Sequence, residues 1–230
     1  MTDESDYCES LVRDADKDRF LATLFAPASR RSDLLTLYAF DVETAAVAHR
    51  VRDPVAGEIR LQWWHDALSR DGGAAGHPVV DALSALLHRN DIDRGIVLDL
   101  IDARRRALYA DDEITEAEFE LAASENAGAV FQLAAQILDG PPGDATRLAA
   151  HHAGVAATAA QVAPDAVGFD AAAMSDRHRD AVRALIPKLP GAVLPALLPL
   201  TLVVDGRMPL PQWRKQWILW RASKRLERWV

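Results

Sequence analysis

The sequence predicts an all-α fold, and three observations lead to this prediction. Alanine occupies 42 of the 230 positions, while Phe, Trp and Tyr together supply only 7%, and this composition favours helices over strands. Apolar residues recur at the helical spacing along the whole chain, without a convincing strand-like alternation. Because the predicted loops are short and no linker separates two compositions, we expect residues 1–230 to form a single-domain bundle of about nine or ten helices.

The first half of the chain predicts helices in the following order. A stripe of apolar residues over 11–25 indicates the first helical region, which Pro27 ends. Ser32 is a candidate N-cap for a helix that continues to about Arg50, and Asp53-Pro54 then interrupts the chain. Further helices are predicted at about 57–70, 79–89 and 93–110.

In the second half, Thr115 gives the clearest start of a helix. Thr115 and Glu118 have the spacing of a capping box for a long helix to about Leu138, which the glycines and prolines of 140–143 close. The uncharged stretch 189–204 contains three prolines and is shorter than the roughly 20 residues of a membrane-spanning helix, so we expect a kinked core segment. Further helices are predicted at about 144–162, 174–185, 192–203 and 212–229.

Charge is distributed unevenly along the chain. The net charge is −8, but residues 206–230 alone carry +6, from seven lysines and arginines against one glutamate, together with four of the six tryptophans. The remainder is strongly acidic, and the Arg104–Arg106 triplet is too short for a basic stripe. We interpret this triplet as a surface cluster or a set of ion pairs, and we predict no nucleic-acid partner.

Cysteine content and the first residues bear on the compartment. Cys8 is the single cysteine, so the chain cannot form an internal disulfide or a multi-thiolate metal site, which is typical of a reducing compartment. The first ten residues are acidic and lack the apolar run of a secretory signal. These observations predict a cytoplasmic protein. If its C-terminal helix contacts lipid, we expect the protein to lie peripherally at the inner face of the membrane.

Common catalytic signatures are absent from the sequence. It lacks the glycine-rich nucleotide loops, the GxSxG elbow, and the HExxH and CxxC metal motifs. His151-His152 is the only histidine cluster, and adjacent residues of a helix point about 100° apart. We therefore expect one of these histidines to be exposed and the other packed or hydrogen-bonded, and we predict no metal site.

A family resemblance begins in residues 19–68. The strings RFLATLFAP (Arg19 to Pro27), LYAF (Leu37 to Phe40) and GEIRLQWWHDAL (Gly57 to Leu68) together resemble the squalene/phytoene synthase family. The resemblance is clear over about residues 7–163. It implies an isoprenoid-synthase-like fold, which agrees with the helical bundle that periodicity predicts.

The resemblance also implies a chemistry. Enzymes of this family condense two prenyl diphosphates, and two aspartate-rich motifs on facing helices hold the Mg²⁺ ions that neutralise the departing diphosphate. The first motif places paired aspartates five and six residues after the Phe of Tyr-Ala-Phe. Here those positions hold Ala45 and Ala46, and His49 stands where a further acid is expected.

The second motif is expected on the predicted helix 144–162, which has no acid after its first residue. Within the family, the chain resembles the non-catalytic branch related to mitochondrial complex I assembly factor six. This resemblance implies a pseudoenzyme that serves as an assembly or interaction factor for the respiratory NADH:quinone oxidoreductase. It implies respiratory-complex subunits or assembly proteins as partners, and no cofactor.

Two other functions stay open. A divergent prenyl transferase of isoprenoid biosynthesis would need Mg²⁺, held by acids such as Asp41, Asp53 or Asp102. A lipid or isoprenoid binder would use the apolar cavity that the fold implies. The candidate diphosphate-binding residues are Arg30, Arg31, Tyr38 and Arg60. The other interpretation of the three arginines is that they form ion pairs with the acidic part of the protein.

The predicted helix 212–229 carries the basic, tryptophan-rich end of the chain. At about 100° per residue, its tryptophans fall within an arc of about 80° beside an arc of arginines. Three interpretations stay open: the tryptophans dock on the protein's own core, bind the acidic surface of a partner, or lie at a membrane interface. The residues of the partner-binding interpretation are Trp213, Arg214, Trp217, Trp220, Arg221 and Arg225.

Overall fold

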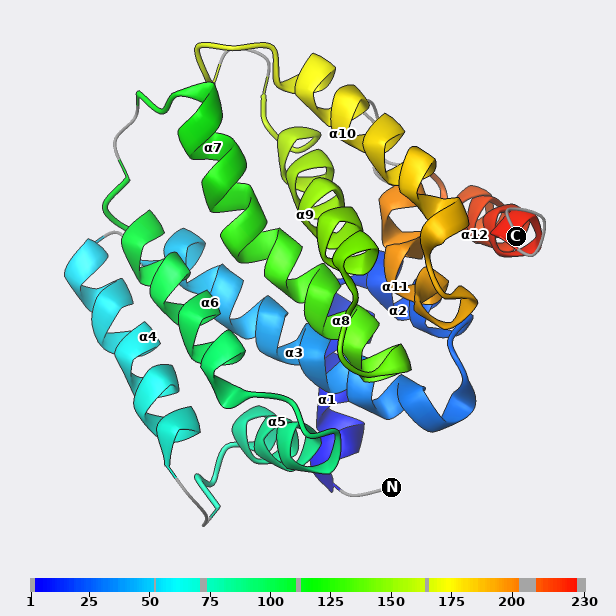
Figure 1. Ribbon diagram of the computed structural model, residues 1–230. Coiled ribbons are helices and arrows are strands. Elements are labelled where there is room, and N and C mark those ends of the chain that lie inside the picture. Colours follow the sequence, from blue (N-terminus) through cyan, green and yellow to red (C-terminus); the bar gives the residue numbers. More distant parts are fainter. Residues whose placement is uncertain are drawn as a thin grey trace.

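The chain is an assembly of helices. A computed structural model describes residues 3–51, 53–70, 74–110, 113–163, 166–202 and 210–226, apart from the side chains of His49, Arg225 and Leu226. Within these ranges short loops join the helices and no strand is found. The helices α1 to α12 pack side by side in a bundle (Figure 1), which confirms the all-α prediction.

The first half of the chain supplies α1 to α6. The predicted apolar stripe over 11–25 belongs to two helices, because the Asp16 side chain accepts a hydrogen bond from the backbone N–H of Arg19 and thereby starts α2. The six helices are α1 (Asp3–Ala15), α2 (Lys17–Thr23), α3 (Ala28–Arg50), α4 (Pro54–Ser69), α5 (Pro78–Arg89) and α6 (Arg94–Ala107).

The start of α3 differs from the prediction. The helix begins at Ala28, directly after Pro27, whose backbone is extended at φ −52° and ψ 137°. Proline is tolerated at this boundary because the first turn needs no N–H from it. The predicted cap, Ser32, lies inside the helix, and its hydroxyl oxygen is 2.9 Å from that of Ser5 on α1. Ser32 therefore makes a tertiary contact and is not a cap.

The predicted capping box is confirmed. Thr115 and Glu118 each accept a hydrogen bond from the other's backbone N–H at the start of α7 (Glu116–Ala123). The predicted long helix continues through the π-helical segment η1 (Ser124–Gly128) into α8 (Ala129–Asp139), and the three form one continuous helix (Figure 1). Single π-helical turns of this kind are frequent at functional sites.

Prolines divide the predicted helix 192–203 into short pieces, because proline has no N–H for the preceding turn and clashes with it. Within the ranges described above, no helix reaches the length and apolarity needed to cross a membrane. The remaining elements are α9 (Asp144–Ala159), α10 (Ala171–Leu185), η2 (Ile186–Lys188), η3 (Gly191–Val193), α11 (Leu194–Leu197), η4 (Leu198–Leu202) and α12 (Gln212–Leu226).

Helix α3 lies at the centre of the bundle, with α1, α5, α6 and α8 in contact with it (Figure 1). Its fully buried Leu37 and Phe40 belong to the main hydrophobic cluster, together with Leu100 of α6 and Leu133 of α8. Burial of each such side chain contributes about 1.5–3 kcal/mol. A further layer follows, in which α9 packs between α8 and α10.

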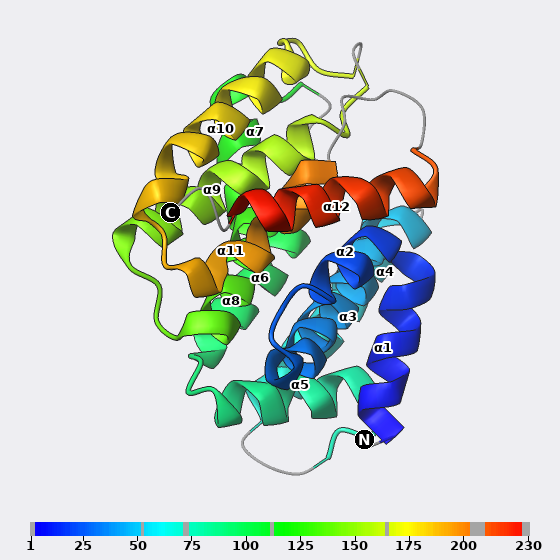
Figure 2. The same ribbon diagram turned by 90° about the vertical axis from the view of Figure 1, so that its right-hand side faces the viewer.

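Helix α12 crosses the outside of the bundle over α2 and η4 (Figure 2). Leu219 is fully buried there, in a small apolar cluster with Leu21 of α2 and Leu198 of η4. One face of α12 is thus fixed to the body of the protein. This contact determines which of its side chains point to solvent.

Candidate functional site

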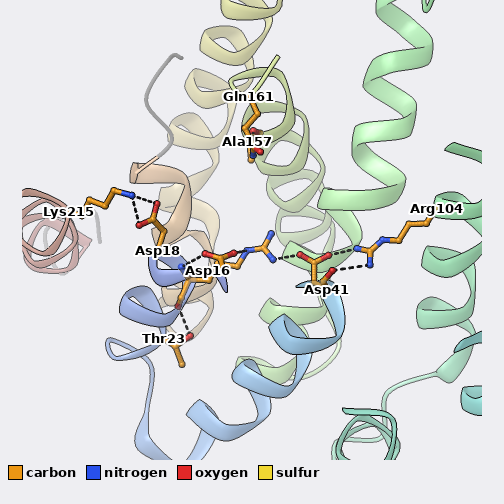
Figure 3. A network of polar contacts seen from close by, with 9 residues as sticks. Asp16, Asp18, Thr23, Asp41, Arg104, Ala157, Gln161 and Lys215 are labelled. Atoms are coloured by element: carbon orange, nitrogen blue, oxygen red, sulfur yellow. Dashed lines mark hydrogen bonds and ion pairs between the residues drawn. The ribbon is translucent and has the colours of Figure 1, made fainter. Parts of the chain in front are cut away.

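A buried ion-pair network lies between α2, α3 and α6 (Figure 3). One carboxylate oxygen of Asp41 accepts a hydrogen bond from Arg19 of α2, and the other accepts from Arg104 of α6. Arg104 also donates to the hydroxyl of Thr44 on α3, and both Asp41 and Arg104 are buried. The network therefore joins three helices that are far apart in the sequence.

Aromatic rings and a second carboxylate complete the surroundings of the two arginines. The Cζ atom of Arg19 lies 5.1 Å from the ring centroid of Tyr38, and its Nε lies 3.5 Å from a carboxylate oxygen of Asp16. The Cζ atom of Arg104 lies 5.7 Å from the ring centroid of Phe40. Cation–π contacts of this kind restrain both guanidinium groups. Two cations thus face two anions in a fixed arrangement.

Burial and the neighbouring charges set the protonation states in this network. Burial alone would raise the pKa of Asp41, but Arg19 and Arg104 outweigh it and lower this pKa to about 2. Burial raises the pKa of Tyr38 to about 12, against the opposing effect of Arg19. Asp41 is therefore ionised and Tyr38 protonated at neutral pH, and neither is poised to exchange a proton there.

Acid is expected to remove the contribution of Asp41 to stability. Its pKa falls from the ordinary 3.8 to about 2 in the folded protein, so the stabilisation is complete above the unfolded pKa and is lost as the pH falls through the folded one. The shift corresponds to about 2 kcal/mol. Urea unfolding followed from about pH 7 to about pH 2 measures this loss. Asp41→Asn should lack this part of the pH dependence, and an unchanged dependence would contradict the assignment.

The positions where the family resemblance expects aspartates lie one turn beyond Asp41 on α3. Ala45 is exposed and Ala46 is half-buried, and the side chain of His49 lies outside the described residues. Alanine offers no oxygen to a metal ion, and Glu43 accepts a hydrogen bond from a tyrosine hydroxyl at 3.2 Å. The described side chains at this end of α3 therefore do not form a set of oxygen donors for Mg²⁺.

Helix α9 is where the resemblance expects the second aspartate-rich motif. Asp144 is the one acid between its bounds, and its side chain is 99% exposed in the first turn. The buried positions of α9 carry small residues, among them Ala149, Ala153 and Ala156. Helix α9 thus directs methyl groups, and no carboxylate, into the bundle.

The structure does not bring the predicted diphosphate-binding residues together. Arg30 and Arg31 lie near the start of α3. Arg30 donates a hydrogen bond to the side-chain oxygen of Asn90 at 2.7 Å, and Arg31 donates to the backbone oxygen of Ala26 at 2.9 Å. Arg60 of α4 lines a pocket that Val47 of α3 also lines. At 1.5 Å per residue, Val47 lies about 25 Å along α3 from Arg30 and Arg31. Tyr38 is buried in the ion-pair network. These four residues therefore do not form one site.

The pocket beside Arg60 lies between α3, α4 and the start of α5, with a volume of about 570 Å³. The rings of Trp63 and Trp64 each meet the imidazole of His77 edge to face, with centroids 5.4 and 5.1 Å apart. The Nε2 atom of His77 lies 3.4 Å from a carboxylate oxygen of Glu43. The pocket thus combines aromatic walls with both signs of charge.

Helix α12 presents its tryptophans to solvent. Trp213, Trp217 and Trp220 are 70%, 51% and 54% exposed, whereas Leu219 is fully buried. The interpretation that the tryptophans dock on the protein's own core is therefore wrong. Ile218 and Leu219 make that contact instead, because they lie on the opposite side of the helix from the indoles.

The basic side chains of α12 have different roles. The Nζ atom of Lys215 donates to both carboxylate oxygens of Asp18 on α2, at 2.8 and 2.7 Å, and anchors the helix (Figure 3). Arg221 is exposed, with its Cζ atom 5.1 Å from the ring centroid of Trp217. The side chain of Arg225, as well as residues 227–230, lies outside the described part. We call the exposed set Trp213, Arg214, Trp217, Trp220 and Arg221 the α12 surface.

A groove of about 450 Å³ runs along α12 on the side of α10, α11 and η4. Leu197, Leu200 and Ile218 contribute apolar walls, and Arg183 and Arg221 contribute positive charge. Arg221 belongs to both the groove and the α12 surface. The two features are therefore continuous on the molecule.

The structure also brings together three histidines that the sequence analysis did not connect. The ring centroid of His178 on α10 lies 4.9 Å from that of His152 and 5.9 Å from that of His151, both on α9. Burial lowers the pKa of His152 and His178, so both are neutral at pH 7. The contact between the consecutive helices α9 and α10 is the signal that relates His178 to the other two.

Two solved structures share this fold. A crystal structure of a dehydrosqualene synthase with a ligand covers 98% of this chain and 97% of its own, with a TM-score of 0.70 and 15% identity. Squalene synthase HpnC from Alicyclobacillus acidocaldarius covers 97% of this chain and 94% of its own, with a TM-score of 0.64 and 17% identity. At such identities the likeness establishes the isoprenoid synthase fold alone.

Sequence comparison adds a relative and a family. The Bos taurus protein named NADH dehydrogenase (ubiquinone) complex I, assembly factor 6 is 29% identical over 104 residues, which are 44% of this chain and 31% of the bovine protein. The match thus spans about a third of that relative's length. The family model for squalene/phytoene synthase matches residues 12–167, about two thirds of the chain. The chain therefore belongs to the squalene/phytoene synthase family.

Proposed function

We propose that this chain is a non-catalytic member of its family that acts as an assembly or interaction factor for a respiratory NADH:quinone oxidoreductase. The observation that carries the proposal lies on α3, where Ala45 and Ala46 replace the expected aspartates and Asp41 is bound between two arginines. Without carboxylates at this place, a departing diphosphate would lack the metal ions that neutralise it. The name of the bovine relative supports the choice of respiratory enzyme.

The α12 surface supplies the partner contact in this proposal. Tryptophan and arginine are enriched at the centres of protein interfaces, where they contribute much of the binding energy. Three exposed indoles on one helix are an unusual amount of apolar area for a surface without a partner. The arginines among them favour an acidic partner surface. The apolar groove beside α12 offers a place for an anchoring side chain of that partner.

Replacing Trp213, Trp217 and Trp220 together with alanine is expected to abolish co-purification of respiratory-complex subunits. The stability of the chain should change by about 0.5 kcal/mol or less for each exposed side chain, because all three are already in contact with solvent. Affinity purification of the full chain from its native cell, followed by mass spectrometry, measures the first effect. Urea unfolding measures the second.

Trp63→Ala is the matched control, since Trp63 is a 42% exposed tryptophan on α4, away from α12. This variant should retain the co-purifying subunits. Capture of the same subunits by the triple variant, or of none by the unchanged chain, would overturn the proposal. A different result would assign the α12 surface to a membrane interface instead: the purified chain binds anionic vesicles, the triple variant does not, and no respiratory-complex subunit co-purifies.

A divergent prenyl transferase is the rival function, and the match of residues 12–167 to the squalene/phytoene synthase family favours it. The full chain would be incubated with prenyl diphosphates, Mg²⁺ and NADPH. We expect no product above the level without protein. Robust turnover would replace the non-catalytic proposal with the enzymatic one.

A lipid or isoprenoid binder is a third function, which the groove beside α12 favours. Its apolar walls suit a hydrocarbon chain, while Arg183 and Arg221 suit an anionic head group. Native mass spectrometry of the chain purified from its own cells tests this function. A bound lipid that is lost in Arg221→Ala would support it, and a chain of unliganded mass would count against it.

A further inference from the structure

Four side chains with metal-binding chemistry meet where α9 and α10 pack near α7. The Nδ1 atoms of His152 and His178 lie 3.0 Å apart. One carboxylate oxygen of Glu120 lies 3.3 Å from Nε2 of His151 and 3.8 Å from Nε2 of His178. One ring nitrogen from each histidine can be chosen so that all three lie within 4.8 Å of one another. Among the residues that the structure describes, no other group of three such side chains is this close.

These separations are near those that one metal ion requires. With zinc–nitrogen bonds of about 2.0–2.1 Å, two ligand atoms of a tetrahedral site are about 3.3 Å apart. The 3.0 Å between the Nδ1 atoms of His152 and His178 and the 3.3 Å between Nε2 of His151 and the Glu120 carboxylate lie near this value. The 3.8 Å separation ends on Nε2 of His178, the ring nitrogen that does not face His152. Two ring nitrogens at 3.0 Å share either an N–H···N hydrogen bond or a metal ion, because two lone pairs at this distance would repel each other. The chosen nitrogens of the three histidines lie within 4.8 Å of one another, so the imidazoles would close by up to about 1.5 Å to share one ion.

The backbone holds this cluster in place. A Cβ atom on Gly154 of α9 would lie 2.2 Å from the backbone nitrogen of Gly128 in η1, so the two helices approach more closely here than any other residue would allow. This approach puts Nδ1 of His151 at 2.7 Å from the hydroxyl of Ser124. With Nδ1 occupied by that hydrogen bond, Nε2 is the nitrogen that faces Glu120. Partners of this kind orient metal-binding histidines in known sites.

Burial of the cluster is graded from one side to the other. The His178 side chain is 8% exposed, while those of His151 and Glu120 are 31% and 38% exposed. An ion would therefore enter from the side of Glu120 and reach His178 last. The same three helices form a small apolar cluster that includes Val155 and Met174, which keeps the inner end dry.

We propose that His151, His152 and His178 bind one Zn²⁺ ion with Glu120 as the fourth ligand. Imidazole and carboxylate are ligands that zinc prefers, and four protein ligands make a closed site whose role is structural. The ion ties α9 and α10 to α7 and stabilises their packing. This site shares no residue with the α12 surface or with the ion-pair network, so it stands or falls independently of the proposed function.

The test uses the full chain purified without a polyhistidine tag. Equilibrium dialysis against Zn²⁺ should give about one zinc per chain, and Co²⁺ in its place should give the strong visible absorption of a four-coordinate site. His152→Gln and His178→Gln should lose both signals. His88→Gln, which changes an exposed histidine on α5, should keep both. Zinc should raise the melting temperature of the unchanged chain and of His88→Gln only.

Ser124→Ala separates orientation from ligation. It removes the hydrogen bond to His151 and leaves the four ligands, so zinc affinity should fall by about 10- to 100-fold with the stoichiometry unchanged. If His178→Gln fails to fold, X-ray absorption of the zinc-loaded unchanged chain identifies the ligands directly. Failure of the unchanged chain to retain zinc, full affinity in a folded His178→Gln, or a shell without imidazole would overturn the proposal.

Discussion

Asp41→Ala is expected to lower the free energy of unfolding by about 3–5 kcal/mol. The substitution leaves Arg19 and Arg104 without the carboxylate that they share. Arg104 is buried, so its charge can regain water only if the packing of α3 and α6 opens. Urea unfolding of the full chain, followed by circular dichroism, measures the change.

Asp180→Ala is the matched control for this substitution. Asp180 pairs with Arg183 at 2.7 Å, but both side chains are about two thirds exposed, so the loss should be at most about 1 kcal/mol. If Asp41→Ala cost no more than this control, the buried network would have no structural role. The position of Asp41 would then have to be explained by function instead.

Gly154→Ala is expected to destabilise the chain by at least about 1–3 kcal/mol. The new methyl group would lie 2.2 Å from the nitrogen and 2.5 Å from the Cα atom of Gly128, and a change of rotamer cannot relieve a contact with backbone. Alanine is the better helix former by about 1 kcal/mol, but the overlap outweighs this gain. Urea unfolding gives the magnitude, and faster amide hydrogen exchange in α9 would locate the disruption.

Gly168→Ala controls for the loss of a glycine alone. No heavy atom lies within 4 Å of the Cβ position there, so the effect should stay within about 0.5 kcal/mol. Equal stability of the two variants would show that α9 and η1 can separate at no cost. The close approach of these helices would then not be what fixes the histidine cluster.

Much of the fold could be predicted because its signals are local. The capping box of Thr115 and Glu118 identifies the start of α7 correctly, and the prediction for 79–89 misses the start of α5 by one residue. The errors arise where two signals compete. Ser32 has a good capping side chain, but Pro27 ends the preceding segment so sharply that α3 can begin directly after it. Asp16 divides a stripe whose apolar spacing alone gives no break.

The sites were less predictable because they depend on contacts between distant residues. Arg104 was expected in a surface cluster or an ion pair, and only the packing of α6 on α3 shows that its pair with Asp41 is buried. His178 becomes informative only beside α9. On α12 the large indoles suggested the inward face, yet the smaller Leu219 takes that place. The role of the α12 surface in partner binding stays a prediction.

The π-helical segment η1 changes the phase of the continuous helix that contains it. A π-helical turn holds about one residue more than an α-helical turn, and one residue corresponds to about 100° of rotation about the axis. Glu120 before η1 and Ser124 at its first position face the histidines of α9, and Val130 and Leu133 after it face the main core. One helix thereby serves two neighbours in different directions. If η1 became a regular α-helix with all its residues kept, the buried side of α8 would turn away from the core by about that angle.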